Sequence, residues 1–228
     1  MAKTIIIGGF GPGISTAVAD TFGAAGFSVA LVGRNAERVA AGAKALAAKG
    51  IRAEAFPADL SKPADIRAMV GKVRASLGAI SVLQWSAYAG GAGDLTTASA
   101  EELAAVVGIA TGGLTTAVQA TLPDLVAEKG AVLVTNGGLG FFDPKVDAVG
   151  VEWNAMGLSV ANSAKHKLVG LLAHKLKAQG VYVGEVVVTG TVKGSAFDAA
   201  NNGTIDPNAV SARFWDMFQS RSPVSATI

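Results

Sequence analysis

The chain begins with a short apolar segment that runs directly into a cluster of glycines. Residues 3–8 read Lys-Thr-Ile-Ile-Ile-Gly, and Gly9, Gly11 and Gly13 follow before an alanine-rich stretch that starts at Ile14. β-Branched residues favour a strand, and glycines permit the tight turn between a strand and a helix. The first amides of such a helix point at the turn without partners, so this arrangement is typical of a site for a dinucleotide pyrophosphate.

The residues after the glycines decide how much weight this motif carries, because a glycine-rich turn alone also occurs in other α/β proteins. A second strand is expected at 28–32, after a helix, and Gly33, Arg34 and Asn35 close it. A strand, a glycine turn, a helix and a second strand form the unit that binds dinucleotides. The sequence therefore predicts nucleotide binding.

Short apolar segments alternate with helical stretches along the whole chain, which indicates an α/β protein with a parallel sheet. We predict one Rossmann-type doubly wound domain over 1–228, with helices on both faces and strand order 3-2-1-4-5-6. Loop 189–207 is a candidate lid over a substrate. The expected strands are 3–8, 28–32, 51–56, 80–85, 130–135 and 181–188, and the expected helices are 14–25, 35–49, 63–77, 99–122, 155–179 and 207–219.

Composition excludes several classes of function. Half of the 228 residues are hydrophobic, 16% are charged and the net charge is +2, without a basic stripe for nucleic acid. The chain has no cysteine and only two histidines, His166 and His174, so we expect no disulfide and no metal site. The first apolar segment is too short for a signal peptide or a membrane span, and a cytoplasmic location is the expectation.

Five segments taken together resemble the short-chain dehydrogenase/reductase family over nearly the whole chain. They are Gly9-x-x-x-Gly13-Ile14, Gly33-Arg34, Asp59-Leu60, Val82-Leu83 and Gly130-Ala131-Val132-Leu133-Val134. The third glycine of the family's loop is Ser15 here. The resemblance implies hydride transfer between a nicotinamide cofactor and a carbonyl or alcohol carbon.

The resemblance also implies a set of cofactor-binding residues. In the family, an acid at the end of the second strand binds an unphosphorylated ribose, whereas Arg34 here favours NADP over NAD. Arg34 could instead be a solvated residue at a helix start, and Asp59 could order its turn rather than meet the adenine. The implied cofactor-binding residues are Gly9, Phe10, Gly11, Pro12, Gly13, Ile14, Arg34, Asn35, Asp59, Leu60, Ser86, Ala87, Lys165, Thr189 and Val192.

Three of the family's four catalytic positions carry other residues. Aligning the Tyr-x-x-x-Lys segment on Lys165 leaves Ala161 at the tyrosine, and the serine and asparagine positions fall on Gly137 and Ala110. The only tyrosines, Tyr88 and Tyr182, lie outside that helix, so a change of register restores nothing. Lys165 can still bind the nicotinamide ribose, although it could also be a solvated lysine.

Other residues near these positions are candidates of a weaker kind. Asn136, Asn154 and Asn162 are the other polar groups nearby, and both histidines are expected at the surface. Trp85 and Tyr88 are expected to line a pocket or pack in the core. In the family, the substrate site is flanked by the segments that carry Phe141, Phe142, Trp153, Met156 and Phe197 here.

Three functions remain open at this point. The first is an NADP-dependent oxidoreductase with a non-standard active site, acting on a small apolar carbonyl, imine or related compound. The second is a non-catalytic NADP-binding sensor or structural partner, and the third is an isomerase or lyase. The short tail after residue 220 leaves room for a short seventh strand or none. A homodimer through the 155–179 helix and a homotetramer are both plausible.

Overall fold

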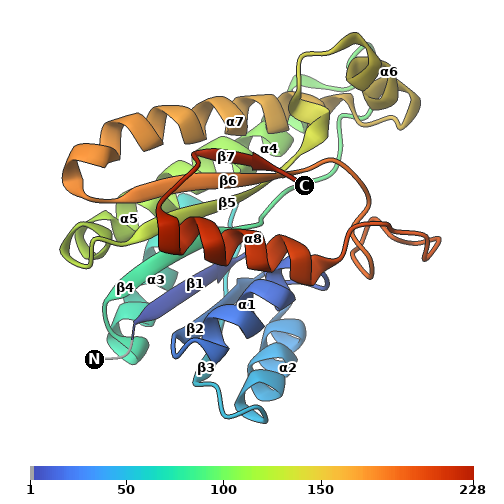
Figure 1. The fold of residues 1–228 in the computed structure, drawn as a ribbon. Coiled ribbons are helices and arrows are strands. Elements are labelled where there is room, and N and C mark those ends of the chain that lie inside the picture. The colour runs from blue at the N-terminus through green and yellow to red at the C-terminus, as the bar shows by residue number, and fades with distance from the viewer. Residues whose placement is uncertain (1–2) are drawn as a thin grey trace.

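A single parallel sheet organises the computed structural model, which describes residues 3–228. Its strand order is β3-β2-β1-β4-β5-β6-β7 (Figure 1). Each of the six neighbouring pairs is parallel. The strands are β1 Thr4–Gly8, β2 Ser28–Gly33, β3 Ala53–Pro57, β4 Ile80–Trp85, β5 Ala131–Gly137, β6 Tyr182–Val188 and β7 Ser225–Thr227.

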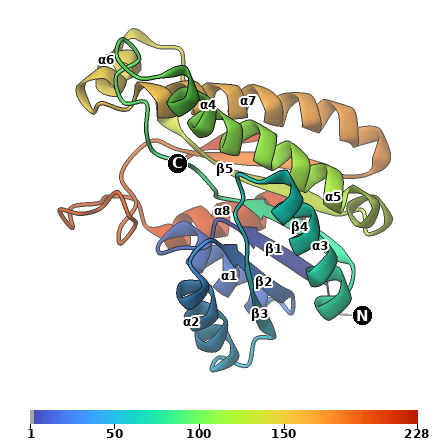
Figure 2. The ribbon, with the colours of Figure 1, turned by 180° about the vertical axis from the view of Figure 1, so that it is seen from behind.

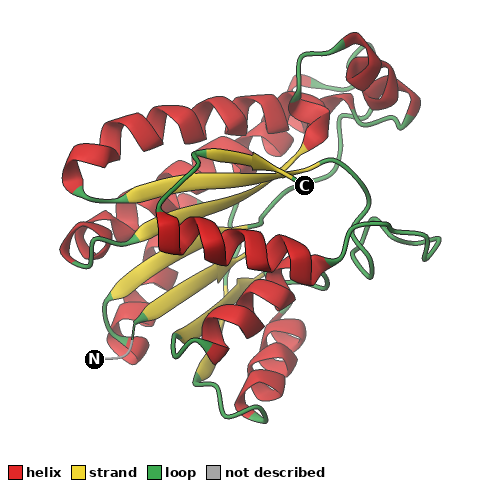
Figure 3. Cartoon of the chain, in the orientation of Figure 1, coloured by secondary structure: helices red, strands yellow, loops and turns green. Residues whose placement is uncertain are grey.

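Helices cover both faces of this sheet, as the pattern of apolar segments predicts (Figure 3). One face packs against α1, α2 and α8, and the opposite face packs against α3, α5 and α7 (Figure 2). The α-helices are α1 Ile14–Ala24, α2 Ala36–Ala47, α3 Pro63–Leu77, α4 Ala100–Gly108, α5 Leu114–Ala127, α6 Pro144–Glu152, α7 Met156–Leu176 and α8 Pro207–Ser220.

The predicted fold class and strand order are therefore confirmed, and the open question about the last strand has an answer. A seventh strand of three residues exists, and it pairs with β6 through Glu185 and Ser225, among others. The carboxyl ends of the parallel strands meet at one edge of the sheet, where the glycine turn and the loop after β6 also lie. In parallel α/β sheets this edge is where ligands bind.

Local signals explain where several helices begin. The Asn35 side chain accepts a hydrogen bond from the Arg38 amide and caps α2, and Asp206 caps α8 in the same way. Ser99 and Glu102 form a capping box at the start of α4. Such caps satisfy amides that otherwise lack partners in the first turn of a helix.

Among the α-helices of residues 3–228, α6 is the one that the sequence patterns did not predict. Its start signal is present, because Asp143 caps it and Pro144 occupies its first turn. The helix has nine residues and buries only Gly150, so it lacks the apolar stripe by which longer helices are recognised. Phe142, Val151 and Trp153 are exposed on this part of the molecule.

The predicted 99–122 helix is interrupted. A π-helical turn, Ile109–Gly113, separates α4 from α5. A Cβ added at Gly113 would lie 2.5 Å from the Leu60 carbonyl oxygen and 3.1 Å from the Trp85 ring, so the helix can pass this close only with glycine. Such turns often mark functional sites, and Ala110 lies in this one.

One stretch, Ala100–Ala127, is long and apolar enough to cross a membrane by length and composition alone. In this fold 44% of its most apolar window is buried inside the protein, and α5 packs on α3 and β4. Core helices of soluble proteins pass the same test.

Candidate functional site

The glycine turn after β1, which we call the cradle, packs closely against the segment after β4 and the loop after β6. Gly9 and Gly13 have φ angles of +86° and +87°, which L side chains rarely adopt. A Cβ added at Gly9 would lie 2.5 Å from the Ala87 amide nitrogen, and one added at Gly13 would lie 3.3 Å from Ser195 Cβ. Gly13 caps α1 without any side-chain hydrogen bond, so the first amides of that helix point at the cradle.

Ser15, at the position of the family's third glycine, holds this turn together. Its buried Oγ accepts a hydrogen bond from the Gly11 amide and donates one to the Gly11 carbonyl, both at 2.8 Å. The Thr16 hydroxyl donates to the same carbonyl at 2.8 Å. The exchange of glycine for serine therefore adds hydrogen bonds within the turn.

Phe10 turns its side chain away from the cradle. A Cβ added at Gly42 of α2 would overlap its ring, so the ring lies between the turn and α2. The Phe10 amide donates to the Val32 carbonyl at 2.8 Å. Of the residues predicted to bind the cofactor, Phe10 can thus offer only its remaining backbone groups.

Two arginines lie after the end of β2, whereas the sequence analysis predicted a cofactor-binding role for Arg34 alone. Arg34 and Arg38 are both exposed. The Arg38 Nη1 atom lies 3.9 Å from a Cβ added at Gly11, so this guanidinium reaches the glycine turn. Arg38 lies in the first turn of α2, three residues after the N-cap Asn35, so the cap signal in the sequence could have drawn attention to it. The side-chain oxygen of Asn35 is engaged by the Arg38 amide at 2.8 Å.

Asp59 orders its own turn. Its Oδ1 accepts hydrogen bonds from the Ser61 amide at 3.0 Å and from the Ser61 hydroxyl at 2.7 Å. These bonds, together with the positive charges of Lys62 and Arg34, hold the pKa of the carboxyl below its usual value. The Leu60 side chain is buried in the core, so a cofactor could meet only its backbone.

The residues after β4 divide between the core and the carboxyl edge. Trp85 is fully buried, which decides between the two roles that its sequence position allowed. Ser86 and Ala87 lie beside the glycine turn, where the Ser86 amide donates to the Gly8 carbonyl at 2.7 Å. Tyr88 is 42% exposed, and burial of the rest of its ring raises the pKa of its hydroxyl.

Small apolar side chains gather at two of the lost catalytic positions. Ala110 and Ala161 share a buried cluster with Ala92 and Val106. Ala92 enters this cluster from the loop after β4 with a φ angle of +48°, which is uncommon for a residue with a side chain. The space at the family's tyrosine is therefore closed by packing.

Gly137, at the position of the family's serine, lies against the side-chain carboxamide of Asn162. A Cβ added at Gly137 would lie 2.6 Å from Nδ2 of Asn162, so a serine there would displace that side chain. Asn162 is buried, and its backbone carbonyl accepts a hydrogen bond from Asn136 at 3.1 Å. The Asn162 carboxamide thus lies where the family's serine would stand. Asn154, the third asparagine considered, is exposed.

Lys165 is buried, with 4% of its surface exposed. Burial lowers the pKa of its ammonium to about 8, and the nearby Glu185 carboxylate opposes that shift. Within residues 3–228 the ammonium has no hydrogen bond or salt bridge to another side chain. A desolvated cation of this kind is not the solvated helix lysine of the alternative interpretation.

Glu185, in the middle of β6, joins several elements beneath the carboxyl edge. Its fully buried carboxylate accepts hydrogen bonds from Asn136 at 2.9 Å and from Ser225 at 3.0 Å. His166 Nδ1 also binds it, while 47% of the His166 side chain remains exposed. The sequence placed His166 at the surface and missed this partner.

The loop between β6 and α8 has an internal framework. The Asp198 carboxylate accepts hydrogen bonds from three backbone amides, those of Gly194, Asn202 and Gly203, at 2.7–2.8 Å. Val192 forms an isolated bridge with Ile205 and is buried. The loop extends beyond the carboxyl edge of the sheet (Figure 1), and Ser195 at its start lies against Gly13.

Two contacts connect this loop to other parts of the protein. The Phe197 and Tyr88 rings lie 5.2 Å apart, so the loop touches the segment after β4. The Thr189 amide and hydroxyl both donate to the Ile228 carbonyl, at 2.9 and 2.8 Å. Of the predicted cofactor residues in this loop, Thr189 is exposed and Val192 is buried.

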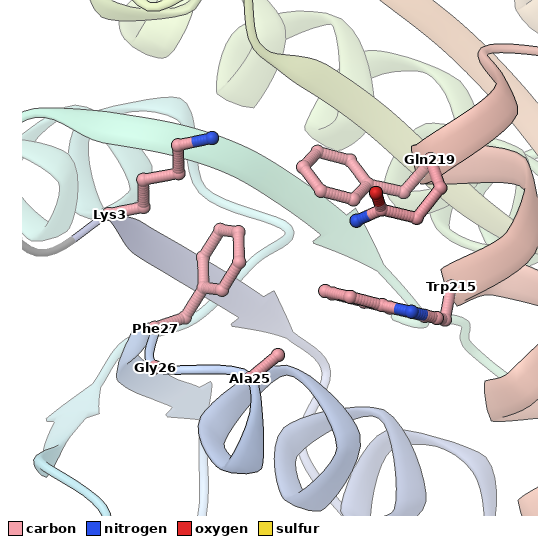
Figure 4. Close-up of a pocket in the computed structure, with 7 residues that line it drawn as sticks. Lys3, Ala25, Gly26, Phe27, Trp215 and Gln219 are labelled. Atoms are coloured by element: carbon pink, nitrogen blue, oxygen red, sulfur yellow. The ribbon is translucent and has the colours of Figure 1, made fainter.

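A separate hollow of about 340 Å³ lies at the opposite, amino edge of the sheet (Figure 4). Phe27, Trp215 and Phe218 line it, and their rings pack edge to face or tilted against one another. These contacts attach α8 to the start of β2, far from the glycine turn. We assign the chemistry to the carboxyl edge because the glycine cradle, the arginines and Lys165 lie there.

The residues present fit a dinucleotide. The cradle accepts only glycine, the amides of α1 face it, and two guanidinium groups stand where a phosphorylated ribose would reach. In the part of the chain that the structure describes, no three acidic or histidine side chains gather as a metal site.

Comparison with known proteins is consistent with this geometry. A family model described as short chain dehydrogenase matches residues 3–204. Among curated protein sequences, no match to this chain was found.

Three solved structures illustrate the likeness of fold. A metagenomic short-chain oxidoreductase in complex with NADP is 21% identical, with coverage of 99% of this chain and 95% of the other and a TM-score of 0.80. A short-chain dehydrogenase from Sphingobium yanoikuyae in complex with NADPH is 24% identical, with coverage of 99% and 87% and a TM-score of 0.81. A dehydrogenase/reductase from Sinorhizobium meliloti is 21% identical, with coverage of 100% and 94% and a TM-score of 0.86.

Proposed function

Because this chain belongs to the short-chain dehydrogenase family, we propose that it is an NADP(H)-dependent oxidoreductase with a non-standard active site. The observation that supports the proposal is the glycine turn itself. Gly9 and Gly13 have positive φ angles, a Cβ at Gly9 would clash with the Ala87 backbone, and Gly13 begins α1 without a side-chain cap on the first amides. Bound at this edge, the cofactor would supply hydride chemistry at the nicotinamide ring.

The choice of NADP rests on the arginines at the end of β2. A ribose 2′-phosphate would meet Arg34 and Arg38 there, and charge-assisted bonds to guanidinium groups are among the stronger polar contacts. The Arg38 guanidinium already lies beside Gly11, so little rearrangement is needed. The structural neighbours solved with NADP or NADPH support the same choice.

The protein must handle protons differently from a member with the family's tyrosine and serine. Lys165 holds a proton on a desolvated ammonium with a pKa of about 8, where it can bind the nicotinamide ribose or exchange the proton near neutral pH. Asn162 offers a carboxamide next to Gly137, where a substrate oxygen or nitrogen could bind. The packed cluster of Ala110 and Ala161 excludes water from the remaining space.

This arrangement suits a substrate that demands little acid catalysis. General acid catalysis contributes about 10²–10⁴-fold to rates, and a cationic imine needs no proton to accept hydride. We therefore propose a small apolar carbonyl, imine or related compound, with imines favoured by the missing tyrosine. Tyr88 and Phe197, both partly exposed, offer aromatic surface at the mouth of the site.

The test of this function is turnover. Purified protein with NADPH is followed at 340 nm against panels of cyclic imines, aldehydes and ketones, with Lys165→Met and Asn162→Ala as comparison variants. We expect oxidation of NADPH with at least one imine or carbonyl, and loss of most of that rate in the Lys165 variant. If both variants oxidised NADPH at the wild-type rate, Lys165 and Asn162 would have no role in the mechanism.

A second candidate is a non-catalytic NADP-binding sensor or structural partner. The observation that favours it is the burial of Lys165, Asn162 and Ala161, each at most 5% exposed, because substrates must reach a catalytic group. Tight NADPH binding without turnover on any panel member would favour this alternative.

The proposal extends to the location of the protein in the cell, its partners and its oligomeric state. We expect a cytoplasmic protein that acts on a small molecule, without nucleic acid or membrane as a partner. A homodimer or homotetramer would cover the edge strand β7 or the outer face of α7.

A further inference from the structure

Three polar side chains form a cluster at the carboxyl ends of β4 and β5, and of these the family resemblance implies a role for Ser86 alone. Gln84 Nε2 donates hydrogen bonds to Ser86 Oγ at 2.7 Å and to Thr135 Oγ1 at 3.1 Å. The two hydroxyl oxygens lie 2.8 Å apart. Gln84 is fully buried, whereas Ser86 and Thr135 are partly exposed at the carboxyl edge.

The hydrogen bonds within this cluster leave one hydroxyl hydrogen without an acceptor. The two Gln84 amide hydrogens go to the two hydroxyl oxygens, and one hydroxyl donates to the other. The second hydroxyl keeps a hydrogen for which residues 3–228 offer no acceptor among the side-chain bonds of the cluster. Gln84 lies on the buried side of the pair, so the side that remains for this hydrogen is the partly exposed one.

The orientation of the Gln84 amide follows from the same count. Its Oε1 atom is buried without a hydrogen-bond partner in the described structure. If oxygen and nitrogen were exchanged, two amide hydrogens would occupy that position without acceptors, in place of one carbonyl oxygen. Unmade hydrogen bonds of buried groups are costly, so the orientation with two donors toward the hydroxyls is the better one.

The pair lies next to the glycine cradle. Gly8 of β1 pairs with Trp85, and Trp85 pairs with Val134, so Ser86 and Thr135 stand one residue beyond, level with Gly9. A dinucleotide with its pyrophosphate on the cradle would lie along the carboxyl edge. If the arginines at the end of β2 hold its adenosine half, the other half would extend over β4 and β5, where the hydroxyl pair lies.

We propose that Ser86 and Thr135, oriented by Gln84, present one hydroxyl hydrogen to an oxygen of the nicotinamide ribose and so position the nicotinamide half of NADP(H). This inference rests on the proposed function, because it needs a dinucleotide in the cradle. The three residues are positioning residues. Thr135 follows Leu133 by two residues and so lies on the face of the sheet opposite α7, the helix that carries Lys165.

The test compares two probes that share the adenosine half. Dissociation constants are measured by calorimetry for NADPH and for adenosine 2′,5′-bisphosphate, which lacks the nicotinamide riboside. One neutral hydrogen bond corresponds to a change of about three- to tenfold in affinity. We expect Ser86→Ala/Thr135→Val, which removes both hydroxyl groups, to weaken NADPH binding by that factor and to leave the bisphosphate within about twofold of wild type.

Two further variants separate the hydrogen-bond role from packing. Gln84→Glu keeps the shape but offers a carboxylate, which accepts both hydroxyl hydrogens and leaves none for the cofactor, so it should weaken NADPH like the double variant. Thr135→Ser keeps the hydroxyl and should retain most of the NADPH affinity even if the Gln84 variant fails to fold. Thr227→Val, at an exposed position on β7, is the matched control and should change neither affinity.

These measurements separate a failure of the proposed role of the hydroxyl pair from a failure of the proposed NADP(H) binding. If wild-type protein binds neither probe, the proposed function and the inference both fall. If wild type binds NADPH and the hydroxyl variants bind it equally well, or lose both probes alike, the inference alone is overturned.

Discussion

A few single residues have surroundings that lead directly to measurements. The Ala87 backbone approaches Gly9 closely, Gly13 has a positive φ angle, and Lys165 is buried with a lowered pKa. Arg34 and Arg38 are exposed cations at the end of β2. Each can be changed without altering the others, and each leads to a different measurement.

Arg34→Ala tests the assignment of NADP. A charge-assisted bond to a phosphate is worth about 1.5–3 kcal/mol, so we expect NADPH to bind about 10- to 100-fold more weakly while NADH affinity stays unchanged. Arg38→Ala should act in the same direction. Arg67→Ala, an exposed arginine on α3, is the control. Equal losses for NADPH and NADH would contradict a role at the 2′-phosphate.

Gly9→Ala tests the cradle itself. The added methyl group would lie 2.5 Å from the Ala87 amide nitrogen, so binding of NADPH should be lost and stability should fall. Gly26→Ala is the matched control, because Gly26 has a φ of +91° and nothing within 4 Å of an added Cβ. The control should lose stability, by about 1 kcal/mol or more, and keep its NADPH affinity. Loss of binding in both variants would point to general strain.

The lowered pKa of Lys165 predicts how the free energy of unfolding depends on pH. Its pKa is about 8 when folded and 10.5 ordinarily, so below pH 8 folding carries the full cost of burying a charge. Between these values the folded protein has released the proton and the unfolded chain has not, so stability rises with pH. Relative to Lys165→Met, the wild-type free energy of unfolding should rise from pH 7 to pH 10 by on the order of 3 kcal/mol.

Urea unfolding of both proteins at several pH values measures this difference. A wild-type stability that runs parallel to that of Lys165→Met throughout would show that the lysine keeps an ordinary pKa and is solvated.

Among the larger elements, the loop between β6 and α8 contacts both the glycine turn and the segment after β4. Asp198 holds it through three backbone amides, and Ser195 and Phe197 bring it against the glycine turn and Tyr88. The hydrogen bonds of Asp198 lie within the loop and do not involve the cradle.

Asp198→Ala should loosen this loop and leave the sheet intact. We expect faster amide hydrogen exchange over residues 190–205, weaker NADPH binding and a midpoint of thermal unfolding close to that of wild type, because the lost bonds lie within one loop. Asp206→Ala, which removes the cap of the neighbouring helix α8, is the comparison and should change exchange mainly in that helix. Unchanged exchange over 190–205 would show that other contacts hold the loop.

At the scale of the whole molecule, the sequence was sufficient for the architecture and insufficient for the site. Strand order followed from the alternation of apolar segments and helices, since parallel strands joined by right-handed crossovers leave few arrangements. The helix α6 was missed because its nine residues bury one glycine, although Asp143 and Pro144 carried its start signal.

The features of the site that sequence reasoning missed are contacts between residues far apart in the chain. No pattern places Asn162 in the space at Gly137, Arg38 beside Gly11 or His166 on Glu185, because side-chain direction and packing decide these pairs. The substitutions at Ala110 and Ala161 were visible in the sequence, but the closing of their space by Ala92 was not.

Binding of NADP(H) at the carboxyl edge of the sheet underlies every proposal above, and calorimetric titration of the purified protein with NADPH and with NADH measures it. We expect saturable one-site binding of NADPH, at least tenfold tighter than that of NADH. Absence of NADPH binding, or equal affinity for the two nucleotides, would contradict the reading of the glycine cradle or of the arginines beside it.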